Sequence, residues 1–133
     1  RKLVFSQFKF DEWYKGYALF EDIDFSYQVS RDYNLAVVSN SHVLHLHEYN
    51  LATKKNALKY GDVEVVDKLY FVSKNKNEFN LYACYWSCIG LFIRNLLFSV
   101  LKFETSTAFR AYANLRAIVR CKFFGISRGK YYL

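Results

Sequence analysis

Residues 20–47 decide the predicted fold, and they read FEDIDFSYQVSRDYNLAVVSNSHVLHLH. Residues 21–31 open with three carboxylates, which suit the positive end of a helix dipole, so we predict a helix there. A turn follows, and the short apolar run at 35–38 is typical of a buried strand. At 42–47 polar and apolar side chains alternate, which is the period of a second strand. Helical and strand segments in this order predict an α/β fold.

The chain changes character near residue 80. The polar stretch 48–61 is expected to form a loop and a helix. Apolar residues at helical spacing predict a further helix over 62–76, within a soluble unit that covers residues 1–80. Residues 81–101 are apolar apart from Arg94, and a second helix is expected at 108–124. The 81–101 segment could be a helix lying at the membrane interface or packed on the unit before residue 80, a membrane span, or a core helix. Residues 81–133 are therefore predicted to form a helical, basic, membrane-facing tail.

Composition limits the classes of protein that the chain can belong to. Hydrophobic residues make up 53% of the 133 residues and aromatic residues 20%, which excludes a disordered chain. The net charge is +7, and after Leu101 the only acidic residue is Glu104, so an anionic partner is expected. Nucleic acid is disfavoured as that partner because the aromatic residues do not alternate with basic ones in a strand pattern. The three cysteines are predicted to be buried thiols, since their number and spacing suit neither paired disulfides nor zinc.

Five short segments occur in a distinctive order. They are Phe10-Asp11-Glu12 at 10–12, Glu21-Asp22-Ile23-Asp24-Phe25 at 21–25, Leu35-Ala36-Val37-Val38 at 35–38, Val43-Leu44-His45 at 43–45, and Tyr70-Phe71-Val72-Ser73-Lys74 at 70–74. This set resembles the end of the catalytic domain in family 2 glycosyltransferases. The resemblance implies that residues 1–80 are the C-terminal, acceptor-side part of a GT-A domain, which is an α/β fold. It also implies an enzyme of cell-envelope or polysaccharide synthesis that transfers a sugar from a nucleotide-sugar to a glycan or lipid-linked acceptor.

The resemblance assigns roles to individual residues. Asp22 matches the catalytic base, and Glu21 matches its neighbour in the acceptor site. Asp24 and Trp13 are the predicted substrate-binding residues. His45 is the candidate metal ligand, with His47 weaker, for the divalent cation (Mg²⁺ or Mn²⁺) that the full-length enzyme is expected to use. One general base suffices for inverting transfer, because a nucleoside diphosphate leaves as a stable anion.

Other interpretations stand beside these. Acidic residues at a helix start are often only caps, and the histidine-bearing face could simply be solvated. Gln28 stands where many members of the family have Arg, and Ser39-Asn40 stands where a Pro is common. The sequence has no upstream nucleotide-binding βαβ unit, so we expect a fragment that is inactive alone and belongs at the cytoplasmic face of the membrane. The alternatives are a non-enzymatic membrane-associated protein and an inactive glycosyltransferase relic.

Overall fold

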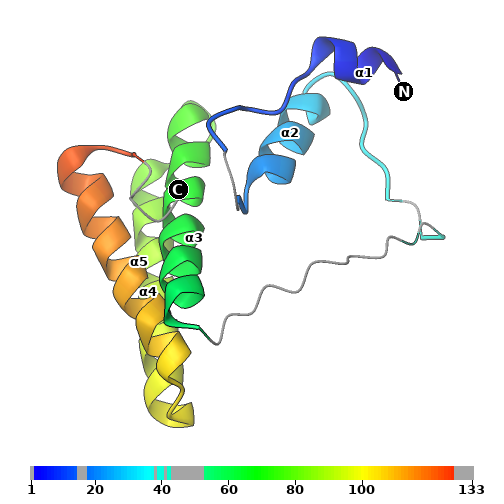
Figure 1. The fold of residues 1–133 in the computed structure, drawn as a ribbon. Helices are drawn as coiled ribbons and strands as arrows, with labels where there is room; N and C mark the ends of the chain where they lie inside the picture. The colour runs from blue at the N-terminus through cyan, green and yellow to red at the C-terminus, as the bar shows by residue number, and fades with distance from the viewer. Residues whose placement is uncertain (1, 15–17, 38, 41, 43–52, 128–133) are drawn as a thin grey trace.

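The computed structural model describes residues 2–14, 18–37, 39–40, 42 and 53–127, and 71% of these residues are helical (Figure 1). The helices are α1 (Lys2–Gln7), α2 (Glu21–Ser30), α3 (Lys54–Lys74), α4 (Leu81–Lys102) and α5 (Thr105–Phe124). The helix predicted at residue 21 is confirmed, as are those over the segments 62–76, 81–101 and 108–124.

The predicted α/β fold of the GT-A type is wrong for the described part of the chain, which contains helices and no strand. Residues 35–37 are irregular instead of forming the first predicted strand, with Leu35 57% and Val37 99% exposed. A strand needs a neighbour that pairs its N–H and C=O groups and covers its apolar side chains. No such neighbour lies among the described residues. The second predicted strand, at 42–47, falls outside them except for His42.

Helices α3, α4 and α5 pack side by side into a bundle, and α2 lies next to the upper end of α3 (Figure 1). The bundle surrounds an apolar core that α3, α4 and α5 all supply. Its buried members are Val65, Val66, Leu69, Phe71, Val72, Cys84, Cys88, Ala117, Ile118 and Cys121. The three cysteines are free and buried, as the sequence predicts. Because α3 packs on α4 and α5, the bundle contains parts of both predicted regions, 1–80 and 81–133. The division of the chain into two domains at residue 80 stays a prediction.

Side-chain caps set where two of these helices begin. The Thr53 side chain accepts a hydrogen bond from the Asn56 N–H at 3.3 Å, and this cap starts α3 well before the predicted residue 62. Asn80 caps α4 in the same way, accepting from the Ala83 N–H at 3.1 Å. Phe103, with φ of 50°, ends α4 in the left-handed conformation and turns the chain into α5.

At Gly61, α3 and α5 approach each other closely. A Cβ atom there would lie 2.7 Å from the Arg110 carbonyl oxygen and 2.9 Å from the Ala113 Cβ. Next to this contact, the buried Asn114 side chain donates to the Gly61 carbonyl oxygen and accepts from Asn95 of α4, each at 2.7 Å. The three helices therefore meet at one tightly packed, hydrogen-bonded level.

We expect Gly61→Ala and Gly90→Ala to have opposite effects on stability. The added methyl of Gly61→Ala forces α3 and α5 apart, so the free energy of unfolding should fall by about 1–3 kcal/mol. Nothing lies within 4 Å of the position at Gly90, on the exposed side of α4. There the better helix propensity of Ala should raise the free energy of unfolding by about 0.5–1 kcal/mol. Urea unfolding followed by circular dichroism measures both, and equal changes would contradict the close approach.

A row of ion pairs joins α3 to α5. The fully buried Asp62 carboxylate accepts from Arg116 at 2.9 Å and from Arg120 at 3.0 Å. Two residues further along α3, Glu64 accepts from Arg110 at 3.0 Å. Each carboxylate meets more than one guanidinium, since Arg94 of α4 also lies 3.8 Å from Glu64. Three arginines of the basic tail are thus engaged inside the bundle.

Candidate functional site

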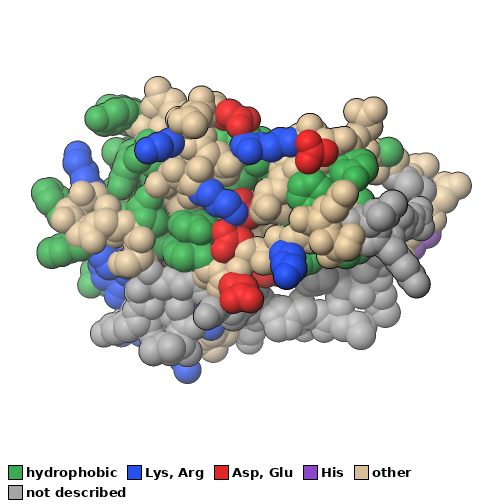
Figure 2. Space-filling view, turned by 90° about the horizontal axis from the view of Figure 1, so that it is seen from above, with side chains coloured by type: hydrophobic (Ala, Val, Ile, Leu, Met, Phe, Trp, Pro, Cys, Tyr) green, Lys and Arg blue, Asp and Glu red, His purple; other side chains and the backbone are tan. Residues whose placement is uncertain are grey.

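Three of the five segments that carry the resemblance meet at Lys74, the last residue of α3. Its Nζ lies 2.8 Å from Asp11 Oδ2, in the loop after α1, and 2.8 Å from Asp24 Oδ2, in α2. Asp24 is fully buried, and its Oδ2 also accepts from Gln28 at 2.8 Å. Figure 2 looks onto this end of the bundle, where acidic and basic side chains lie interleaved across the middle of the surface. We call Asp11, Asp24 and Lys74 the ionic junction.

Aromatic side chains surround the ionic junction. Trp13 stacks on Tyr70 with ring centroids 3.7 Å apart, and both rings meet Tyr14 edge-on. The Tyr70 hydroxyl donates to Asp11 Oδ2 at 2.9 Å. Burial and this bond to a carboxylate raise the pKa of Tyr70 to about 12. Trp13 therefore packs the loop that follows α1 against α3, and its contact with a substrate stays a prediction.

Within the ionic junction, Asp11 and Lys74 hold each other ionised. Burial alone would raise the pKa of Asp11, but hydrogen bonds from Lys74, the Trp13 N–H and Tyr70 outweigh it and lower that pKa. Burial would likewise lower the pKa of Lys74, but its bonds to Asp11 and Asp24 raise it. The Asp11 contribution to stability is present above pH 3.8, its ordinary pKa, and is lost as pH falls through the lowered value. The Lys74 contribution is lost only as pH rises above 10.5.

We expect Lys74→Met to destabilise the protein and to raise the pKa of Asp11. The substitution leaves the buried Asp24 carboxylate without its cation, so the free energy of unfolding should fall by about 2–3 kcal/mol. Adding Asp24→Asn should restore part of the loss, because no uncompensated charge then remains buried. Urea unfolding gives the stabilities, and a carboxyl-detected NMR titration gives the Asp11 pKa. An unchanged Asp11 pKa in Lys74→Met would show that the two groups do not meet.

The three carboxylates in the first turn of α2 divide between two sides of the helix. Asp22 and Asp24 are two residues apart, which is about 200° around a helix. Asp24 faces α3 and is buried, whereas Asp22 and Glu21 are exposed. One Asp22 oxygen accepts from the Ile23 N–H at 2.8 Å, which fixes the carboxylate at the helix terminus. Asp22 and Glu21 are open to an incoming molecule, and contact of the buried Asp24 with a substrate stays a prediction.

Two buried polar atoms near the ionic junction lack partners in the described part of the protein. They are the Tyr14 hydroxyl and Asp24 Oδ1. Burial raises the pKa of Tyr14, and the nearby charges of Asp24 and Asp67 raise it further, so the phenol stays neutral. Asp67 of α3 accepts from the Leu19 N–H at 3.0 Å and thereby holds the residues just before α2. The sequence analysis singled out neither Tyr14 nor Asp67.

The predicted metal ligands, His45 and His47, lie outside the described residues. Among the residues that the structure describes, no group of three or more His, Cys, Asp or Glu side chains is placed to hold a metal ion. The Asp11 and Asp24 oxygens do not fit a divalent cation either, because both contact the Lys74 ammonium at 2.8 Å. The described part of the chain therefore offers no ligand set for Mg²⁺ or Mn²⁺, and the divalent cation stays a prediction.

Comparisons of the chain with protein-family models, with curated proteins and with solved structures give no match.

Proposed function

We propose that this chain contributes the general base of an inverting glycosyltransferase, with Asp22 as the catalytic residue. The observation that carries the proposal is the ionic junction. Segments 10–12, 21–25 and 70–74 carry the resemblance, and Lys74 joins them through 2.8 Å contacts to Asp11 and Asp24. Residues that are far apart in the sequence are thus gathered around the first turn of α2, where Asp22 is exposed.

The proposed chemistry needs one carboxylate at this position. An Asp22 oxygen takes the proton of an acceptor hydroxyl as that oxygen attacks the anomeric carbon of the donor. A new C–O bond forms with inversion, the bond from the anomeric carbon to the diphosphate oxygen breaks, and the nucleoside diphosphate leaves with that electron pair. The proton held by Asp22 then passes to solvent, which the exposed carboxylate reaches directly.

Burial distributes the other roles around Asp22. Glu21 is exposed beside it and is the proposed neighbour in the acceptor site. The ionic junction acts as a positioning device, because it fixes α2 on α3 and so holds the first turn of α2 still. Its members are charge-compensated and buried or half-buried, which suits positioning better than proton transfer. We assign no nucleotide-sugar site to the described residues, and the membrane at its cytoplasmic face remains the proposed place of action.

The proposal is tested by assaying the protein as its gene encodes it. Purified protein is incubated with a panel of uridine, guanosine and thymidine diphosphate sugars, together with glycan and lipid-linked acceptors. We expect one donor to release its nucleoside diphosphate only when an acceptor is present, with the sugar transferred in inverted configuration. Absence of acceptor-dependent release across the panel, in protein that is folded by circular dichroism, would count against the activity.

A further inference from the structure

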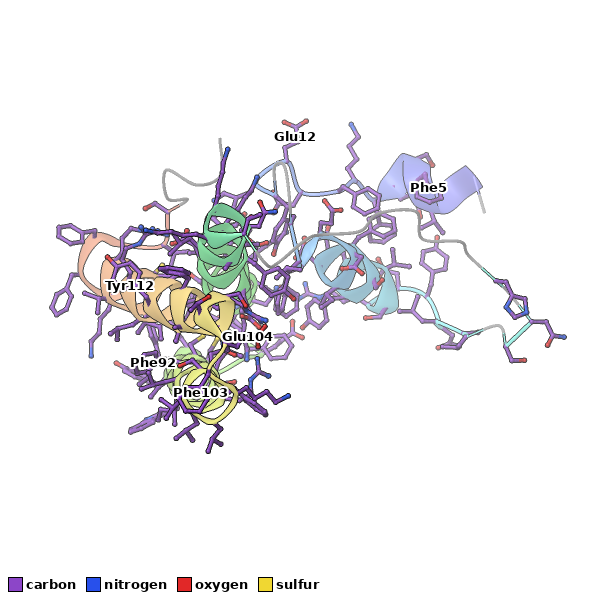
Figure 3. All side chains as sticks on the ribbon, turned by 60° about the horizontal axis from the view of Figure 1, so that its bottom comes forward. Phe5, Glu12, Phe92, Phe103, Glu104 and Tyr112 are labelled. Carbon is purple, nitrogen blue, oxygen red and sulfur yellow. The ribbon has the colours of Figure 1, made fainter. Side chains whose placement is uncertain are left out.

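Large apolar side chains project from the whole length of α4 on the side away from α3 and α5. Figure 3 shows side chains of α4 spreading from the bundle on this side, down to the labelled Phe103. Tyr82 is 83% exposed, Trp86 72% and Leu101 75%. Within an apolar stretch of 18 residues of α4, only 17% of the residues are buried. We define the α4 apolar face by Tyr82, Trp86, Ile93, Leu97, Val100 and Leu101, all of which are exposed.

Cations border the α4 apolar face, and α4 itself contains no acidic residue. Arg94 is about half exposed on one flank, and Lys68 of α3 reaches the same flank by donating to Ser87 Oγ at 2.6 Å. Lys122 of α5 lies on the other flank. The nearest carboxylate inside the bundle, Glu64, is already paired with Arg110 and Arg94. An apolar surface with basic borders complements the acyl region and phosphates of an anionic bilayer.

A groove continues this surface between the first half of α4 and the last half of α5. It has a volume of about 680 Å³, and its walls include Tyr82, Trp86, Ile89 and Ile118. Lys122 also lines the groove. A phospholipid whose acyl chain entered the groove would therefore have its headgroup phosphate near the Lys122 ammonium group. Trp and Tyr side chains are enriched where proteins meet the bilayer interface, and Trp86 and Tyr82 stand at this groove.

The packing of the bundle decides how α4 can lie. By length and composition alone, α4 could cross a membrane. Its inner side, however, is joined to α5 and α3 through the buried pair Asn95 and Asn114. A crossing α4 would take with it the ion pairs of Asp62 and Glu64 at the same level of the bundle, and charged groups are costly in hydrocarbon. An orientation in the plane of the interface buries the apolar face and leaves these pairs in water.

We propose that the α4 apolar face docks on the surface of an anionic phospholipid bilayer, with α4 parallel to the membrane plane. Lys68, Arg94 and Lys122 then face lipid phosphates along both edges of the contact. This inference stands independently of glycosyl transfer, because none of its residues belongs to the ionic junction or to the first turn of α2.

The chain offers an internal reporter, because its only tryptophans are Trp13 and Trp86. In a Trp13→Phe background, Trp86 emission is recorded with vesicles of phosphatidylcholine alone or of phosphatidylcholine mixed with phosphatidylglycerol, an anionic lipid that attracts basic segments. We expect a blue shift and at least about tenfold tighter binding to the anionic vesicles, weakened by salt. Leu97→Glu should reduce that binding about tenfold or more by placing a charge in the contact.

Phe5→Glu is the matched control, since Phe5 is 65% exposed on α1, outside the α4 apolar face. It should leave vesicle binding unchanged. The depth of a tryptophan side chain in the bilayer is then measured from its quenching by brominated lipids. Trp86 is compared with a tryptophan introduced by Ile93→Trp, in a chain that also carries Trp13→Phe and Trp86→Phe. These positions are seven residues apart, about 10 Å along α4. Equal, shallow depths are expected for the in-plane orientation, whereas a deeper reporter at position 93 would mean a crossing helix and overturn the proposal.

Two further results would overturn it. The first is absence of binding to either vesicle by folded protein. The second is unchanged binding in Leu97→Glu. If vesicles fail to bind while Leu97→Glu converts a lipid-free dimer into a monomer, the α4 apolar face is instead a contact between two copies of the chain.

Discussion

Replacing Asp62 with Ala should lower the free energy of unfolding by about 3 kcal/mol, at the low end of the range for breaking a buried ion pair. Asp62 is fully buried, and both of its oxygens accept from Arg120, at 3.0 and 3.1 Å. Arg116 adds a third bond at 2.9 Å. Without the carboxylate, two guanidinium groups are left facing each other in a half-buried seam. The exposure of these arginines, 26% and 22%, is why the lower estimate applies.

A surface pair in the same protein gives the matched control. Arg31 and Glu78 also form an ion pair, but both side chains are about half exposed. Glu78→Ala should therefore change the free energy of unfolding by less than about 1 kcal/mol. Urea unfolding of both variants, followed by circular dichroism, gives the comparison. Equal losses would mean that Asp62 is not buried between α3 and α5.

The pairing of Asp62 also shows why the ion pairs between α3 and α5 could not be predicted from the sequence. The sequence predicts a basic tail with an anionic partner, and Arg110, Arg116 and Arg120 belong to that tail. In the structure they meet Glu64 and Asp62 of α3, more than 40 residues earlier in the chain. Helical spacing places residues on one face of their own helix, but it does not tell which helix packs there. Lys122, which follows these arginines, is exposed.

Helices were predictable because their signals are local. Carboxylates in the first turn predict the start of α2, apolar spacing predicts α3, and the long apolar run at 81–101 predicts α4. The structure joins the helix expected within 48–61 and the helix predicted at 62–76 into the single helix α3. Thr53, with an N–H three residues later, is the recognisable cap at its start. The strand at 35–38 failed for the opposite reason. Its apolar run describes one chain, while a strand is stable only with a partner, and Val37 is 99% exposed in the described structure.

Within the candidate site, the sequence predicts residues but not how deeply each is buried. The predicted base, Asp22, is exposed at the start of α2, and its role stays a prediction. Asp24, two residues later, faces the interior, and its partner is the Lys74 side chain at the end of another helix. Lys74 was part of the resemblance without a role of its own. Its place at the centre of the ionic junction depends on how α2 docks on α3, which no local pattern encodes.

Asp22→Asn should reduce sugar transfer by about 10²–10⁴-fold, the usual contribution of a general base. The amide keeps the shape of the side chain but cannot take a proton from the acceptor hydroxyl at neutral pH. Because Asp22 is exposed and outside the ionic junction, the free energy of unfolding should change by less than about 0.5 kcal/mol. Asp32→Asn is the control, since it removes an exposed carboxylate just after the same helix.

The most direct test of the proposed function is therefore the rate of acceptor-dependent nucleoside diphosphate release by the wild type, Asp22→Asn and Asp32→Asn, measured with the donor and acceptor that the wild type uses. The account predicts loss of transfer in Asp22→Asn alone, with the helical content and urea midpoint of all three proteins equal. Transfer by Asp22→Asn at the wild-type rate would contradict it and remove Asp22 from the role of base.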